Sequence, residues 1–226
     1  YLFFFVSRVP VDFCSAFLVA RIGPKHSIGM STLIHIVFLF LLLTFDSHNW
    51  NLWLMSGVFS LSNGLFFIAY HTDFSKIKDS KHGGKELGYL YMFERLGGII
   101  GPLVGGLLAT FIDPRATIAI AILVLLASQI PLLMSKEPVR THQRITFKGF
   151  PRARFKPDYV ALGAFNIDRL ASLVTWPLLI SLTVFADNTY AKIGFLVAFS
   201  TILSIVLARL FGKIVGLPFD IRHISI

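Results

Sequence analysis

The sequence has few charged residues, a single cysteine and no polar stretch long enough for a water-soluble domain. Of its 226 residues, 15% are charged and 55% are hydrophobic. This composition is typical of an integral membrane protein and excludes a separate soluble domain. Cys14 lies inside an apolar run, so the chain offers neither an internal disulfide nor a cysteine metal site.

Motifs for catalysis, metal binding and nucleic-acid binding are also missing. The seven histidines are scattered along the chain, and no His-Glu-x-x-His, Gly-x-Ser-x-Gly or phosphate-binding loop occurs. Although the net charge is +9, the basic residues lie in short gaps between apolar runs and not on a soluble surface. We therefore predict no enzyme, no cofactor, no metal site and no nucleic-acid partner.

Seven apolar runs approach or exceed the roughly 20 residues that a membrane crossing requires. They are approximately 1–20, 28–45, 50–70, 88–112, 116–134, 159–186 and 190–212. Most basic residues fall in alternate gaps, beginning with the first, whereas only Arg115 and Lys192 fall in the gaps on the other side. By the positive-inside rule the first run crosses inward. We predict an all-α polytopic helical bundle of about seven transmembrane helices in the plasma or inner cell membrane.

The longest gap, 135–158, has seven basic residues, three prolines and few large apolar residues. This composition predicts a cytoplasmic linker between five helices in 1–134 and two helices in 159–226. The chain begins at Tyr1 within an apolar run, without the basic segment or cleavage site of a signal peptide. We therefore expect a fragment of a longer protein.

The segment GGIIGPLVGG, residues 97–106, concentrates glycine within one apolar run. One half of a helical wheel carries only glycine and proline, namely Gly97, Gly98, Gly101, Pro102, Gly105 and Gly106. In water each interior glycine would cost roughly 1 kcal/mol relative to alanine. In lipid the backbone must satisfy its own hydrogen bonds, and small faces let helices approach closely. The segment therefore predicts a tightly packed membrane helix.

Two motifs resemble the major facilitator superfamily of secondary transporters. GGIIGPLVGG matches the family's fifth-helix pattern, Gly-x-x-x-Gly-Pro-x-x-Gly-Gly, at every defined position, and this pattern is most often seen in antiporter branches. AFLVARIGPKHSI resembles the loop signature that follows the family's second helix. The matching residues are Leu18, Arg21, Gly23, Lys25 and Ile28. Alanine stands in place of the signature's first glycine and its aspartate, at Ala16 and Ala20.

This resemblance implies that the seven runs correspond to helices two through eight of a twelve-helix transporter. It also implies alternating-access transport of a small solute by a monomer in a lipid bilayer, with protons as a candidate coupling ion. The signature would form part of a cytoplasmic gate, with Asp73 as a partner of Arg21. The arginine that the family's fourth-helix motif would place near Ser60 is absent.

Charged and polar residues inside the apolar runs are the candidates for a solute or proton pathway, because a buried charge costs several kcal/mol unless it is paired or hydrated. These candidates are Asp168, Arg169, Asn166, Ser172, Thr175, Glu94, Arg95, Asp12 and Arg8. Asp168 lies about 14 Å into its run, near the midplane where transporters bind substrate. Arg8 and Asp12 have i, i+4 spacing, so they can also form a purely structural ion pair.

Structural roles are alternatives for the other candidates as well. Glu94 and Arg95 lie on the glycine side of their run, where they can line a pathway or join two helices through a salt bridge. Seven crossings also fit a seven-helix receptor, but the sequence has neither Asp-Arg-Tyr at a helix end nor Asn-Pro-x-x-Tyr in the last run. A third alternative is an inactive, truncated transporter remnant.

Overall fold

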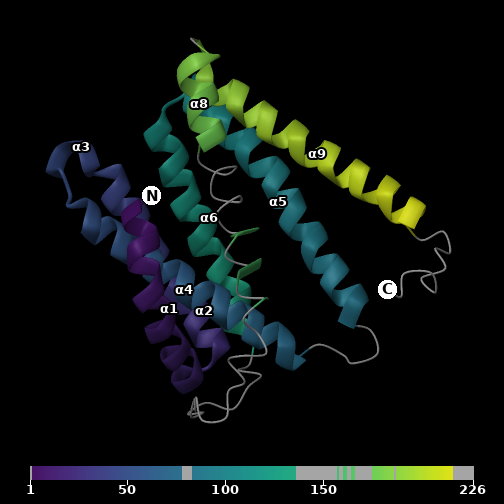
Figure 1. The fold of residues 1–226 in the computed structure, drawn as a ribbon. Helices are drawn as coiled ribbons and strands as arrows, with labels where there is room; N and C mark the ends of the chain where they lie inside the picture. The colour runs from purple at the N-terminus through teal and green to yellow at the C-terminus, as the bar shows by residue number, and fades with distance from the viewer. Residues whose placement is uncertain are drawn as a thin grey trace. The chain divides into compact units, whose positions relative to one another are not determined.

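The computed structural model describes residues 2–77, 83–135, 175–185 and 187–215, with a few positions between 157 and 165. Within these ranges the chain is helical and contains no strand. The helices are α1 (Leu2–Ile22), α2 (Pro24–Leu43), α3 (Phe45–His48), α4 (Leu52–Ile77), α5 (Gly83–Phe111), α6 (Pro114–Met134), α8 (Trp176–Thr183) and α9 (Thr189–Val215) (Figure 1). The predicted all-α helical bundle is confirmed.

Five of the described helices are long and apolar enough to cross a membrane. Their spanning segments are Pro24–Leu43, Leu52–Lys76, Glu86–Phe111, Pro114–Met134 and Thr189–Leu207. They coincide with the second to fifth and the seventh predicted runs. The first run forms α1, whose 21 residues give a length of about 31 Å, close to the thickness of a bilayer core. The sixth run includes α8, and its residues 166–174 lie outside the described residues.

The chain forms two compact units. The first comprises Tyr1–Glu86 and Arg115–Phe155, and the second comprises Leu87–Pro114 and Lys156–Ile226. The first unit therefore holds α1 to α4 and α6, and the second holds most of α5 together with α8 and α9. The linker predicted at 135–158 lies almost entirely outside the described residues, so the division that it marks stays a prediction.

A single residue, Gly23, connects α1 to α2. Its φ of 99° and ψ of 155° lie in a region that only glycine adopts without strain. Pro24 follows as the first residue of α2, where a missing N–H costs no helical hydrogen bond. The amide and the hydroxyl of Ser27 both donate to the Gly23 carbonyl, at 3.1 and 2.8 Å. The chain can therefore reverse direction between two long helices without a loop.

The turn between α2 and α4 is built from side-chain caps. Asn49 adopts a left-handed conformation and ends α3, and the Asn51 side chain accepts a hydrogen bond of 2.8 Å from the amide of Trp53 at the start of α4. The Trp50 indole donates to the Thr44 hydroxyl at 2.9 Å. The hydrogen bond from the Trp53 amide to the Asn51 side chain explains why α4 begins at Leu52, two residues after the predicted boundary.

The core of the first unit is small, and much of it is polar. Val19 of α1 packs against Leu65 and Ala69 of α4, and partly buried aliphatic residues of α1, α2 and α4 surround them. The buried polar residues are Ser15, Ser27, Ser31, Thr32, Ser60 and Ser62. Small hydroxyl residues let membrane helices pack closely and hydrogen-bond to one another.

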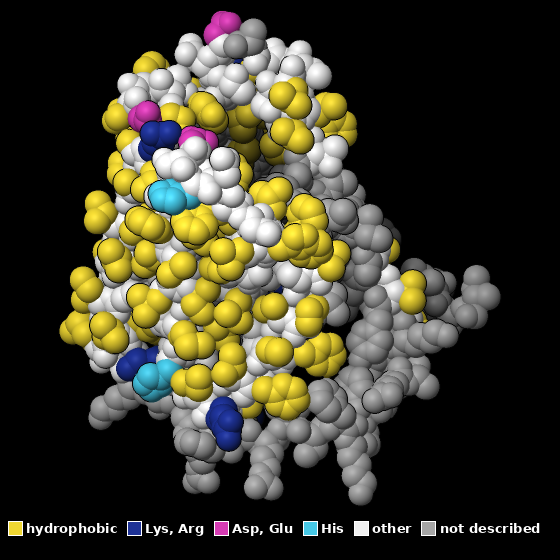
Figure 2. Space-filling model, turned by 90° about the vertical axis from the view of Figure 1, so that its left-hand side faces the viewer, with side chains coloured by type: hydrophobic (Ala, Val, Ile, Leu, Met, Phe, Trp, Pro, Cys, Tyr) yellow, Lys and Arg dark blue, Asp and Glu magenta, His cyan; other side chains and the backbone are white. Residues whose placement is uncertain are grey.

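Large hydrophobic side chains are exposed along the helices, for example Leu33, Val37 and Phe40 of α2. Figure 2 shows that hydrophobic side chains cover much of the face that it draws. Exposed apolar side chains are expected of helices that lie in a bilayer.

Candidate functional site

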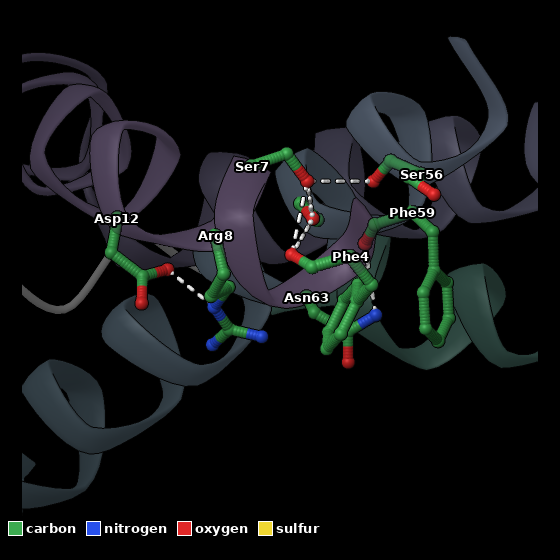
Figure 3. Close-up of polar contacts among 8 residues, drawn as sticks. Phe4, Ser7, Arg8, Asp12, Ser56, Phe59 and Asn63 are labelled. Atoms are coloured by element: carbon green, nitrogen blue, oxygen red, sulfur yellow. Dashed lines mark hydrogen bonds and ion pairs between the residues drawn. The ribbon is translucent and has the colours of Figure 1, made fainter. Parts of the chain in front are cut away.

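Polar side chains of α1 and α4 meet within the first unit and form the candidate site. We call this group the α1–α4 cluster. It consists of Ser7, Arg8, Asp12 and Ser15 from α1 and Ser56, Ser60, Asn63 and Gly64 from α4. Figure 3 shows most of its contacts.

Arg8 and Asp12 form the charged part of the cluster. The Nε atom of Arg8 donates to Oδ1 of Asp12 at 2.6 Å, as the i, i+4 spacing predicts (Figure 3). The exposed side chains of α1, among them Phe13 and Phe17, project roughly opposite to this pair at 100° per residue. The two charges therefore lie on the side of α1 that also carries the buried residue Ser15.

Two aromatic rings flank the Arg8 guanidinium. Its Cζ atom lies 5.8 Å from the centroid of the Phe4 ring and 5.9 Å from that of the Phe67 ring. At this distance the electron-rich ring faces attract a cation. The guanidinium is therefore in contact with one ring from α1 and one ring from α4, and both limit its movement.

Serine hydroxyls join α1 to α4 beside the ion pair, because Ser7 directly precedes Arg8. Ser7 Oγ lies 2.6 Å from Ser60 Oγ, and the two hydroxyls lie 3.0 and 3.1 Å from the carbonyl oxygen of Phe4. Ser7 also reaches the Ser56 carbonyl at 3.4 Å (Figure 3). Ser60, where the family pattern led us to look for an arginine, is instead a fully buried helix contact.

Gly64 of α4 lies against side chains on the polar side of α1. A Cβ atom at this position would lie 2.7 Å from Asp12 Oδ1 and 2.8 Å from Ser15 Oγ. Ser15 is fully buried, and its hydroxyl has no hydrogen-bond partner within the described part of the chain. The Asn63 amide nitrogen next to Gly64 donates to the Phe59 carbonyl at 2.9 Å.

In the second unit the two halves of the glycine segment differ in their contacts, because only the second half packs closely against another helix. A Cβ at Gly97, Gly98 or Gly101 would meet no atom within 4 Å. A Cβ at Gly106 would lie 2.5 Å from the carbonyl oxygen of Tyr190 and 3.2 Å from the Cα of Gly194, both in α9. Thr110 supports this contact, because its hydroxyl accepts a hydrogen bond of 2.9 Å from the Ala191 amide.

The helices that carry these contacts lie within a match to a known protein family. The sequence pattern of the Major Facilitator Superfamily matches residues 2–221. The chain belongs to the major facilitator superfamily. Its members are transporters that move small molecules across membranes, so the predicted resemblance is confirmed at that level. No curated protein and no solved structure matches the chain.

The structure describes all four predicted gate residues of this transporter. Arg21 is exposed, Asp73 is partly buried, and no ion pair between them is found in the described part of the chain. Gly23 forms the turn between α1 and α2, and the Lys25 ammonium donates to the carbonyl of Ser135, just beyond α6. A lysine at that position also complements the negative end of the α6 dipole. The proposed gate stays a prediction.

The remaining pathway candidates that the structure describes belong to the second unit. Glu94 and Arg95 are both exposed on α5, and neither has an ion pair within the described residues. Thr175 is exposed directly before α8, and its side chain makes no capping hydrogen bond. The other four candidates, Asn166, Asp168, Arg169 and Ser172, lie outside the described residues.

Reasoning from the sequence missed the partners that complete the cluster. Ser7, Ser15, Ser60 and Gly64 are small residues within apolar runs, and they carry no motif. Their only signal is that small polar residues in membrane helices favour helix contacts. Within the described residues no group of histidine, cysteine and acidic side chains has a geometry suited to a metal ion.

Proposed function

We propose that the chain is part of a secondary active transporter, which carries a small solute by alternating access. The single observation that carries this proposal is the Arg8–Asp12 pair on the side of α1 that packs against α4, in a chain of the major facilitator superfamily. A charged pair on a membrane helix is expensive, so its default interpretation is a functional one. In this proposal Arg8 and Asp12 line the solute pathway.

The predicted coupling and gating residues extend this proposal. Asp168 is proposed to carry the coupling proton or a substrate charge, and Glu94 and Arg95 are proposed to support the pathway. The prediction that the chain works as a monomer in the plasma or inner membrane belongs here as well. The family match favours a transporter over a seven-helix receptor.

Solute uptake into proteoliposomes tests the proposed role of the pair. The full-length transporter, of which this chain is expected to be a fragment, is purified, reconstituted and presented with labelled sugars, amino acids, organic cations and organic anions. We expect one class to accumulate above protein-free vesicles, and we expect Arg8→Gln and Asp12→Asn each to reduce its uptake at least about tenfold, because each leaves a charge unpaired at membrane depth.

Arg115→Gln is the matched control for that experiment. Arg115 forms the same type of ion pair with Asp46, at 3.0 Å, but both side chains are mostly exposed at the surface of the first unit. Exposed ion pairs contribute little, so uptake should not change in this variant. If no solute accumulates, or if the Arg8 and Asp12 variants transport like the wild type, the proposed function is wrong.

A further inference from the structure

The Arg8 guanidinium keeps most of its hydrogen-bonding capacity unused. An arginine has five N–H donors. Only Nε is engaged, with Asp12, and the two Nη groups have no partner within the described residues. The Phe4 and Phe67 rings lie against the guanidinium. Its two Nη groups can therefore donate two parallel hydrogen bonds to the two oxygens of a carboxylate.

Asp12 has unused capacity on the same side of α1. Its Oδ1 accepts the bond from Arg8, whereas Oδ2 has no partner within the described part of the chain. The Asp12 side chain is 40% exposed and the Arg8 side chain is 22% exposed. Both unused groups are therefore within reach of a small solute.

The charges of the pair determine which solute fits. A lone carboxylate at Arg8 would lie close to the Asp12 carboxylate, and a lone cation at Asp12 would lie close to the guanidinium. Either would add a net charge to a pair that is now neutral, in surroundings of low polarity. A solute with adjacent negative and positive groups satisfies both partners and leaves the site neutral.

We infer that the α1–α4 cluster binds a small zwitterion of the α-amino-acid class. The carboxylate of the zwitterion lies on the two Nη groups of Arg8, and its ammonium group lies on Oδ2 of Asp12. The exposed part of the Phe67 ring provides an apolar contact for the hydrocarbon of the solute. This inference rests on the proposed function for its transport role, but binding can be measured separately.

Binding to the purified protein in lipid nanodiscs provides the test, with equilibrium dialysis of radiolabelled probes as the measurement. Glycine, L-leucine and L-phenylalanine share the zwitterionic head and differ in the side chain. The compounds 4-methylpentanoate and 3-methylbutylamine are leucine without its amine and without its carboxylate. We expect at least one zwitterion to bind, and we expect both single-charge analogues of leucine to bind at least about tenfold more weakly than leucine when leucine binds.

Two variants at Arg8 keep the test informative if folding is disturbed. Arg8→Gln removes the charge, whereas Arg8→Lys retains it and can still pair with Asp12. We expect both to weaken zwitterion binding at least about tenfold, because an ammonium group does not present two parallel N–H donors. Arg115→Gln should bind as the wild type does, and the elution profile of each variant shows whether it is folded.

The outcomes separate this inference from the proposed function. If none of the three zwitterions binds the folded wild type, or if Arg8→Lys binds them unchanged, the inference is overturned. Uptake of a sugar without zwitterion binding would overturn it as well, although transport itself would stand. Zwitterion binding without any uptake would support the site and contradict the transport proposal.

Discussion

Gly64 of α4 lies against Asp12 and Ser15 on the charged side of α1. Its missing side chain leaves room for Asp12 Oδ1 and for Ser15 Oγ, which would lie 2.7 and 2.8 Å from a Cβ atom. We predict that Gly64→Ala lowers the free energy of unfolding by about 1–3 kcal/mol, because the carboxylate or the helix must move. The midpoint of thermal unfolding in detergent measures this effect.

Gly57 is the matched control in the same helix. A Cβ at Gly57 would meet nothing within 4 Å, so Gly57→Ala adds no clash. Alanine is a better helix former than glycine by up to about 1 kcal/mol, so this variant should be as stable as the wild type or slightly more so. Equal midpoints for the two variants would mean that α4 does not approach α1 closely at Gly64.

The sequence of α5 predicts the helix and its glycine face, but it does not predict which helix packs against that face. The glycine pattern correctly predicted a membrane helix with one bare side, because the 3.6-residue period sorts side chains by face. Which glycines make contact was not predictable, since Gly106 meets Gly194, and that partner belongs to a separate apolar run. A helix pattern describes a face but does not name the helix that packs on it.

Substitutions within that segment distinguish its two halves. We predict that Gly106→Ala destabilises the packing of α5 on α9 by about 1–3 kcal/mol, because its Cβ would clash with backbone atoms that cannot rotate away. Gly98→Ala meets open space and should leave stability unchanged. The unfolding midpoints of the two variants provide the comparison, and a loss in Gly98→Ala equal to that in Gly106→Ala would refute the predicted contact.

At the scale of the whole molecule, the apolar runs predicted most of the described helices because bilayer thickness sets their length. The short helix α3 was missed, since Thr44 and Asn49 define it locally and it has no apolar period. In the candidate site, the Arg8–Asp12 pair was predictable from its i, i+4 spacing. The serines that join α1 to α4 were not, because about 50 residues separate Ser7 from Ser60.

The orientation of the molecule is the remaining prediction of the sequence. Basic residues gather in alternate gaps, so the turn around Ser47 should face outside and Ser135 should face the cytoplasm. We replace Cys14 with serine and introduce Ser47→Cys or Ser135→Cys, both at exposed positions. A membrane-impermeant maleimide should label Ser47→Cys in intact cells, and it should label Ser135→Cys only after permeabilisation.

Two parts of this prediction can fail independently. Three helices, α4, α5 and α6, lie between the two positions, so an odd number of crossings puts them on opposite sides whichever way the chain inserts. Labelling of both cysteines in intact cells would therefore contradict the number of crossings. Labelling of Ser135→Cys alone would preserve that number and reverse the orientation, which would place the basic segment after α6 outside the cell and contradict the positive-inside assignment.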